Sequence, residues 1–217
     1  MGSRFRLREP FSGISHLIGA ALSIAAMIAL IIQSHGNDWK ITSFAIYGGS
    51  LILLYLASSL YHLLPARPEI VEKLRRFDQC AIFFLIAGCY TPVCLLKLRG
   101  PWGWTLLSIV WAIALGGTIT QAVWAKMPCW LNVVLYIIMG WMVVIAFGPI
   151  THHLAVQSLE WLLCGGIIYS VGAVVFAVER PRLWPGVFGF HDLWHVFVLA
   201  GSAAHFMMML TLVRSPV

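Results

Sequence analysis

Seven long runs of apolar residues, separated by short polar connections, extend along the whole chain. The runs fall at about 13–33, 41–63, 77–97, 103–124, 130–149, 159–179 and 190–212. A helix needs about 20 mostly apolar residues to cross a bilayer, and each run is close to that length. Strands of a membrane barrel would alternate polar and apolar side chains, which these runs do not. The pattern predicts an all-α integral membrane protein, in which residues 1–217 form a single domain of seven transmembrane helices.

The positions of the prolines agree with the predicted ends of these helices. Pro65 and Pro68 follow the second run and are expected to end its helix. Pro92 and Pro149 lie inside or at the end of a run, where a membrane helix tolerates a kink if its neighbours satisfy the freed carbonyl. The first run is too long for the core of a signal peptide, so we interpret it as a helix of the mature protein.

Composition narrows the class of protein further. Hydrophobic residues make up 60% of the 217 residues, and only 10% are charged. Soluble domains carry about 25% charged residues, so a soluble enzyme, a nucleic-acid-binding protein and a disordered chain are all excluded. The expected partners are therefore membrane lipids and not nucleic acid, and no feature of the sequence specifies an oligomeric state.

Basic residues in the short connections predict the orientation in the membrane. If the N-terminus is cytoplasmic, ten Lys and Arg residues fall on the inner side and four on the outer side. The inner set is Arg4, Arg6, Arg8, Arg67, Lys73, Arg75, Arg76, Lys126, Arg180 and Arg182; the outer set is Lys40, Lys97, Arg99 and Arg214. This bias matches the positive-inside rule and predicts a cytoplasmic N-terminus and an external C-terminus.

With this orientation, polar residues of four different helices fall at the same depth, in the inner leaflet. Ionisable residues inside a membrane are costly and are candidates for function. The residues at this depth are Glu9, Ser12, His16, Ser58, His62, Asp78, His191, Asp192 and His195. Misplacing one span would scatter them over both faces of the membrane, so their convergence supports both the topology and a site.

The spacing of these residues favours a metal site. His191 and His195 are separated by one helical turn and share a helix face, and His62 adds a third imidazole from another helix. Three imidazoles are a suitable ligand set for a catalytic zinc ion, which keeps a fourth position for water. Asp78 is at the right depth to accept a proton from that water. Ser58 could orient Asp78 or bind the water or the substrate.

Other polar residues near this depth are candidates for supporting the ligands. Glu9, His16 and Asp192 could accept a hydrogen bond from the second N–H of a ligating histidine. Asp192 lies about 100° around the helix from His191, so it is a poorer candidate for direct ligation. His205 lies two to three turns deeper in the last span, where we expect a hydrogen-bonded packing residue.

At these residues the sequence resembles the hemolysin III branch of the PAQR family, which includes the progestin and adipoQ receptors. The resemblance covers nearly the whole chain. It rests on Glu9-x-x-Ser12-x-x-Ser15-His16, Ser58-x-x-x-His62, Phe77-Asp78, His191-x-x-x-His195 and the stretches YGGSLILLYLASSLYH and GCYTP. The N-terminal tail is too short for an extended ligand-binding domain of the receptor type, which argues against hormone sensing.

The resemblance implies seven helices with a cytoplasmic N-terminus and a zinc ion near the inner face. It implies His62, His191 and His195 as the zinc ligands, with Asp78 and Ser58 beside the bound water. The wider superfamily includes alkaline ceramidases, which suggests hydrolysis of lipid amides. Close bacterial relatives are small inner-membrane proteins described as hemolysin III homologues or as proteins of membrane homeostasis, so the resemblance implies the inner membrane of a bacterium.

Four functions therefore stand as hypotheses. The first is a zinc-dependent hydrolase of lipid amides or esters that contributes to membrane lipid homeostasis. The second is a non-enzymatic regulator of membrane composition or fluidity with a structural zinc, in which Asp78 could simply pair with Arg75 or Arg76. The third is a hemolysin-like pore-former, although the spans carry no rings of charge. The fourth is a haem protein that uses His62 and one histidine of the last span, which would leave Asp78 without a role.

Overall fold

The computed structural model describes residues 7–124, 127–181, 183–184 and 187–216, and these residues are almost entirely helical. The helices are α1 (Pro10–Gln33), α2 (Asp38–Leu63), α3 (Pro68–Leu96), α4 (Pro101–Val123), α5 (Cys129–Trp141), the 3₁₀ segment η1 (Met142–Ala146), α6 (Phe147–His153), α7 (Val156–Val178) and α8 (Phe190–Arg214). Taken together, α5, η1 and α6 correspond to one predicted span.

Seven helical segments of the described chain are long and apolar enough to cross a membrane. They are α1, α2, α3, α4, the segment Trp130–His153, α7 and α8. The predicted fold class, an all-α integral membrane protein with seven transmembrane helices, is therefore confirmed. Helix α3 has the largest share of buried residues among these segments. The smallest shares are those of α1, α4, the segment Trp130–His153 and α7.

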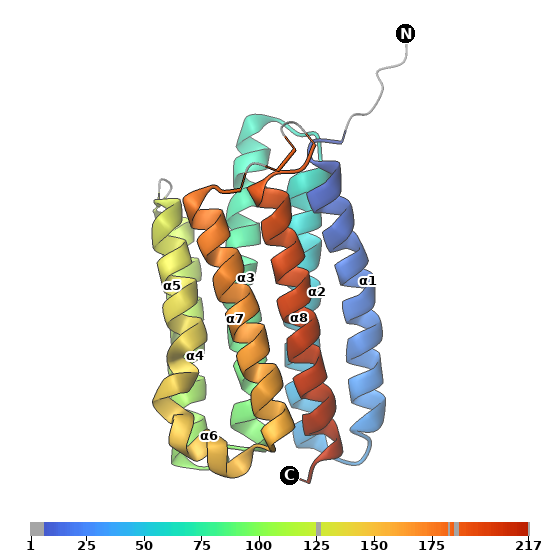
Figure 1. Cartoon of the computed structure of the whole chain (residues 1–217), viewed down its shortest axis with the longest axis vertical. Helices are drawn as coiled ribbons and strands as arrows, with labels where there is room; N and C mark the ends of the chain where they lie inside the picture. The colour runs from blue at the N-terminus through green and yellow to red at the C-terminus, as the bar shows by residue number, and fades with distance from the viewer. Residues whose placement is uncertain (1–6, 125–126, 182, 185–186, 217) are drawn as a thin grey trace.

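The helices run up and down as an elongated bundle (Figure 1). The start of α1, the α2–α3 connection and the start of α8 lie at one end, which we call the N-terminal end. The end of α8 lies at the opposite, C-terminal end. Helix α1 packs closely on α2 and also contacts α8, while α2 packs on α3, α3 on α4 and α7 on α8. Helix α5 touches α3, α4 and α7 only sparsely, which leaves room behind it.

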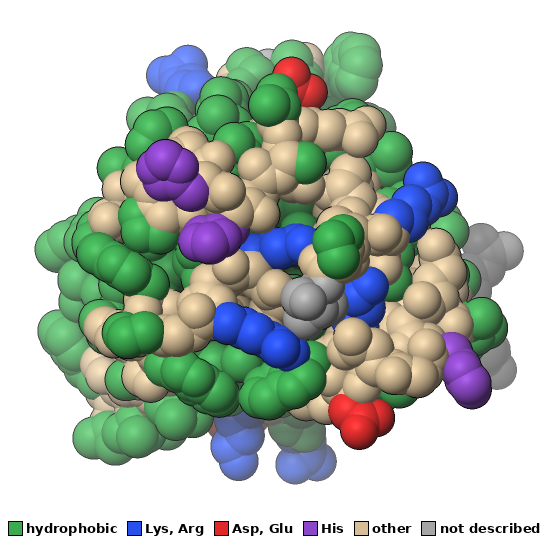
Figure 2. All heavy atoms as spheres, turned by 90° about the horizontal axis from the view of Figure 1, so that it is seen from below, with side chains coloured by type: hydrophobic (Ala, Val, Ile, Leu, Met, Phe, Trp, Pro, Cys, Tyr) green, Lys and Arg blue, Asp and Glu red, His purple; other side chains and the backbone are tan. Residues whose placement is uncertain are grey.

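The C-terminal end shows how the bundle separates polar from apolar side chains. Figure 2 looks onto this end and shows hydrophobic side chains around much of its rim and basic side chains nearer the middle. The ammonium group of Lys40 donates to the carbonyls of Val213 and Ser215 at 2.7 and 2.9 Å. The ammonium group of Lys97 donates to the carbonyl of Pro216 at 2.6 Å. These bonds satisfy a carbonyl in the last turn of α8 and two carbonyls just after the helix.

Helix α3 starts nine residues before the apolar run that predicted it. Pro68 occupies its first turn, where the missing N–H costs nothing, and a polar segment follows. Within that segment Glu72 bonds to Arg75 at 2.7 Å and to Arg76 at 2.9 Å, one turn along the helix. Such pairs support a helix outside the apolar layer, so α3 extends beyond the part that hydropathy alone detects.

The fifth span breaks near its middle. The turn at Met142–Ala146 is 3₁₀, and it lies just before Pro149, which lacks an N–H and whose ring crowds the carbonyl four residues earlier. The Tyr90 hydroxyl on α3 donates to the carbonyls of Gly140 and Met139 at 2.7 and 3.0 Å, and it accepts from the N–H of Val143 at 2.9 Å. One side chain therefore satisfies backbone groups just before the 3₁₀ turn and within it.

Replacing Tyr90 by Phe should destabilise the protein by about 1–3 kcal/mol, because backbone groups at the break would lose their partner inside an apolar medium. Tyr47 offers a matched control, since its hydroxyl is buried on α2 and has no hydrogen-bond partner. Thermal unfolding in detergent should show a lower midpoint for Tyr90→Phe and an equal or higher one for Tyr47→Phe. Equal midpoints for the two variants would show that Tyr90 does not stabilise the break.

Candidate metal centre

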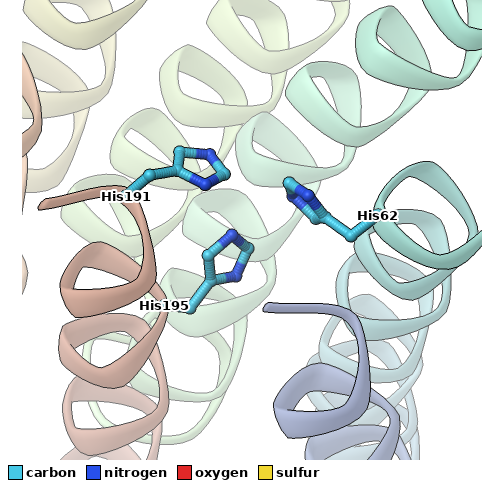
Figure 3. A group of neighbouring side chains, drawn as sticks. All are labelled: His62, His191 and His195. Atoms are coloured by element: carbon cyan, nitrogen blue, oxygen red, sulfur yellow. The ribbon is translucent and has the colours of Figure 1, made fainter. Parts of the chain in front are cut away.

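Three histidine side chains point toward one another at the N-terminal end of the bundle (Figure 3). His62 is in the last turn of α2, and His191 and His195 are in the first two turns of α8. One ligand atom from each ring lies within 4.8 Å of the others. These three histidines lie close enough together to hold a metal ion.

The hydrogen bonds of the rings leave the same nitrogen free on two of them. The Nδ1 of His62 contacts the carboxylate of Glu9, and the Nδ1 of His195 lies 2.9 Å from the Nε2 of His16. The Nε2 atoms of His62 and His195 are buried and have no hydrogen-bond partner. A buried nitrogen without a partner is costly unless something binds it, so these atoms suit a metal ion.

Glu9, just before α1, anchors the edge of the site. Its backbone N–H donates to the carbonyl of His62 at 3.0 Å, and its carboxylate also pairs with Arg8 at 3.7 Å. The hydrogen bond from His62, with the positive charge of Arg8, holds the pKa of the Glu9 carboxyl below its ordinary value. Glu9 is therefore ionised at neutral pH and accepts from the Nδ1–H of His62, which directs the other ring nitrogen toward the site.

Asp192 contacts a hydroxyl and a backbone amide. Its carboxylate accepts from Ser12 on α1 at 2.8 Å and from the N–H of Gly189 at 3.0 Å. The second bond satisfies a free N–H at the start of α8 and places a negative charge at the positive end of the helix dipole. Asp192 thus positions the helix that carries His191 and His195, and it joins that helix to α1.

Asp78 and Ser58 lie beside the histidines. The Asp78 carboxylate is close to His62 and to Ser58, although the Ser58 hydroxyl makes no hydrogen bond of good geometry. Arg75 and Arg76, which the sequence offered as alternative partners for Asp78, both bond to Glu72 nearer the start of α3. Asp78 and Ser58 line an internal cavity together with His191 and His195.

This cavity has a volume of about 280 Å³ and continues from the histidines between α3, α5, α7 and α8. Its walls beyond the site are mainly apolar, with residues such as Leu85, Val93 and Met208. Asn132 on α5 also lines it, and neither the oxygen nor the nitrogen of its buried amide has a partner. Sequence reasoning missed Asn132, whose signal was an isolated amide within the fifth apolar run.

Together, the fold and the site define a heptahelical membrane protein with a buried, metal-competent histidine cluster. Comparison with known proteins gives the family. A family model described as "Haemolysin-III related" matches residues 5–206, so the chain belongs to this family. The resemblance found in the sequence motifs is thereby confirmed.

Several relatives match over most of their length. The chain is 42% identical to "Hemolysin-3" of Bacillus cereus over 206 residues, which is 94% of this chain and 91% of the relative. It is 40% identical to "Hemolysin-3 homolog" of Bacillus subtilis (strain 168) over 205 residues, 93% of each chain. It is 27% identical to the human "Monocyte to macrophage differentiation factor" over 197 residues, 86% of this chain and 78% of the relative.

Elemental analysis of detergent-purified protein, prepared without chelators, should find about one bound metal ion per chain. His62→Ala and His195→Ala should each lose most of it, since each removes a nitrogen that has no other partner. His152→Ala is the control, because that histidine is exposed at the C-terminal end. Equal metal content in all four proteins would contradict the site.

Glu9→Gln should weaken metal binding by roughly 10- to 100-fold, the usual cost of losing a carboxylate that supports a ligating histidine. The amide keeps the size of the side chain and loses its charge, so the fold should survive. Competition with a chromogenic chelator measures the change in affinity. An unchanged affinity would show that the contact between Glu9 and His62 does not support metal binding.

Proposed function

We propose that this protein is a zinc-dependent hydrolase of lipid amides or esters that acts inside the inner membrane of a bacterium and contributes to membrane lipid homeostasis. One observation carries the proposal. His191, His195 and Asp78 line a cavity whose remaining walls are largely apolar, and His62 lies within ligand distance of His191 and His195. A lipid placed there would have its polar group at the histidines and an acyl chain in the cavity.

His62, His191 and His195 would hold the zinc ion. Zinc accepts nitrogen ligands in tetrahedral sites, and catalytic sites use three protein ligands. Among the described His, Cys, Asp and Glu residues, no fourth ligand atom joins this group. When bound, the ion supplies a Lewis acid for the scissile carbonyl and lowers the pKa of water to about 7.

Asp78 would move the proton. Its carboxylate lies at the cavity wall next to His62, where it can take a proton from a water that attacks the carbonyl carbon. The new C–O bond forms as the carbonyl C–N or C–O bond of the lipid breaks. The proton then passes from Asp78 to the departing amine or alcohol, so a carboxylic acid is the second product. Ser58, beside Asp78, would orient this carboxylate or bind the lipid head group.

The predicted topology supports an origin of the substrate in the inner leaflet. The described cations Arg8, Arg67, Lys73, Arg75, Arg76 and Arg180 flank the N-terminal end, where the site lies. This end is cytoplasmic if the positive-inside rule holds for the chain. A lipid of the cytoplasmic leaflet would then have its head group level with the histidines.

A regulator with a structural metal is the second candidate, and the contacts of α1 favour it. Glu9 contacts His62, His16 contacts His195, and Ser12 bonds to Asp192. A metal ion held within this network would join the ends of α1, α2 and α8 and stabilise the fold directly. A pore has less support, because the described lining of the cavity is mainly apolar.

Asp78→Asn separates the two candidates. The hydrolase requires turnover to fall by roughly 10²- to 10⁴-fold, the usual contribution of a general base, while metal content stays unchanged. Release of fatty acid from a panel of lipid amides and esters in liposomes measures turnover. Asp38→Asn is the matched control, because this aspartate is exposed at the C-terminal end and should leave turnover unchanged.

Full turnover by Asp78→Asn would disprove the role of Asp78 as the base. A metal-loaded wild-type protein that hydrolyses no member of the panel would favour the regulator.

A further inference from the structure

His205 is a polar residue in the apolar part of the cavity, far from the metal centre. It lies on α8, ten residues beyond His195, which places it roughly 15 Å further along the helix axis. Its side chain is buried and lines the same cavity as the metal-site histidines. The cavity therefore carries a buried imidazole well away from the polar cluster at its N-terminal end.

A glycine on the neighbouring helix α7 leaves space for this imidazole. A Cβ atom at Gly165 on α7 would lie 2.4 Å from the Cδ2 and 2.7 Å from the Nε2 of His205. Only a glycine leaves space for the ring at that point. The ring of Tyr169, also on α7, lies next to it, with 5.4 Å between ring centroids.

The imidazole has a hydrogen-bonding capacity that the described protein does not use. Neither Nδ1 nor Nε2 of His205 has a hydrogen-bond partner of good geometry among the described residues, and the carbonyl of Leu162 is near enough to the ring to accept from its one N–H. The prediction of a hydrogen-bonded packing residue is therefore not confirmed for the second ring nitrogen. The nearby hydroxyl of Tyr169 is already bonded to Ser202 at 2.8 Å. A neutral imidazole therefore keeps an acceptor nitrogen for which no donor is in place.

Burying a polar group without a partner inside a membrane costs free energy, and an apolar side chain at this position would avoid that cost. A polar residue kept there is therefore a candidate for function. What is missing is a hydrogen-bond donor next to the His205 ring. A half-turn of the ring about χ2 exchanges its nitrogen and carbon positions without moving the backbone, so the ring can turn a nitrogen toward a bound molecule.

We propose that His205 is a specificity-determining residue that accepts a hydrogen bond from a hydroxyl group in the middle of an acyl chain. The proposal rests on the proposed function, because it takes the cavity as the site of the acyl chain. The protein would thus prefer lipids whose chain is hydroxylated roughly 15 Å from the group bound at the histidines. Water could supply the same hydroxyl chemistry, and the experiment distinguishes these two sources.

The test compares the binding of two fatty acids that differ in one hydroxyl, octadecanoate and 12-hydroxyoctadecanoate, to full-length metal-loaded protein in detergent. Native mass spectrometry gives the ratio of their affinities in one experiment. The wild type should prefer the hydroxylated acid by roughly three- to tenfold, the effect of one hydrogen bond. His205→Leu should abolish or reverse the preference, and His205→Gln, which keeps an acceptor, should retain it.

Met207→Leu is the control on the same helix, because Met207 is 39% exposed on the outer surface and should leave the ratio unchanged. A ratio of two ligands within one variant also cancels any general loss of folded protein. Equal affinities in the wild type would mean that water serves the imidazole, and the proposal would be overturned. An unchanged preference in His205→Leu would overturn it as well.

These outcomes separate the inference from the proposed function. If neither fatty acid binds, the cavity does not hold an acyl chain and both fail together. If the hydroxylated acid is preferred but no lipid amide or ester is hydrolysed, the hydrolase fails and the role of His205 stands.

Discussion

Glu9 and His16 each contact one imidazole of the metal centre, and the geometry of the site depends on these two contacts. In a medium of low polarity, the second nitrogen of each ring needs a partner of its own. Glu9 and His16 occupy the Nδ1 atoms of His62 and His195, which leaves both Nε2 atoms free. The N-terminal part of α1 thereby determines which nitrogens are available at the site. Its outer surface, by contrast, is largely apolar.

The same need for internal partners shapes the cavity. At the break in the fifth span, Tyr90 satisfies carbonyl groups just before the 3₁₀ turn and an N–H group within it. Just before the break, the indole N–H of Trp141 on α5 donates to Ser170 on α7 at 2.9 Å and links these two sparsely packed helices. Because the fifth span is broken and α5 packs sparsely, its side chains do not fill the space between α3, α7 and α8.

The family match covers every residue of the site, from Glu9 through His205. The matched region therefore includes the two helices, α2 and α8, that carry the metal-site histidines and helix α1, which supports them. The human relative, at 27% identity, aligns over 86% of the chain. A seven-helix frame tolerates such divergence because lipid-facing positions require only apolar character, whereas Asp192 and Tyr90 make specific bonds that position helices.

The sequence by itself determined the class of protein and the number of its spans, because the length of an apolar run is set by the thickness of the bilayer. It could not show where α3 begins or where the fifth span breaks, since ion pairs on Glu72 and the hydroxyl of Tyr90 decide these points. Helical spacing also placed His191 and His195 on one face. Only the tertiary structure decided that His62 meets them, that Glu9 and His16 support them and that a ring nitrogen of His205 lacks a partner. Those contacts depend on how each helix is rotated and shifted against its neighbours, and packing between helices sets that rotation.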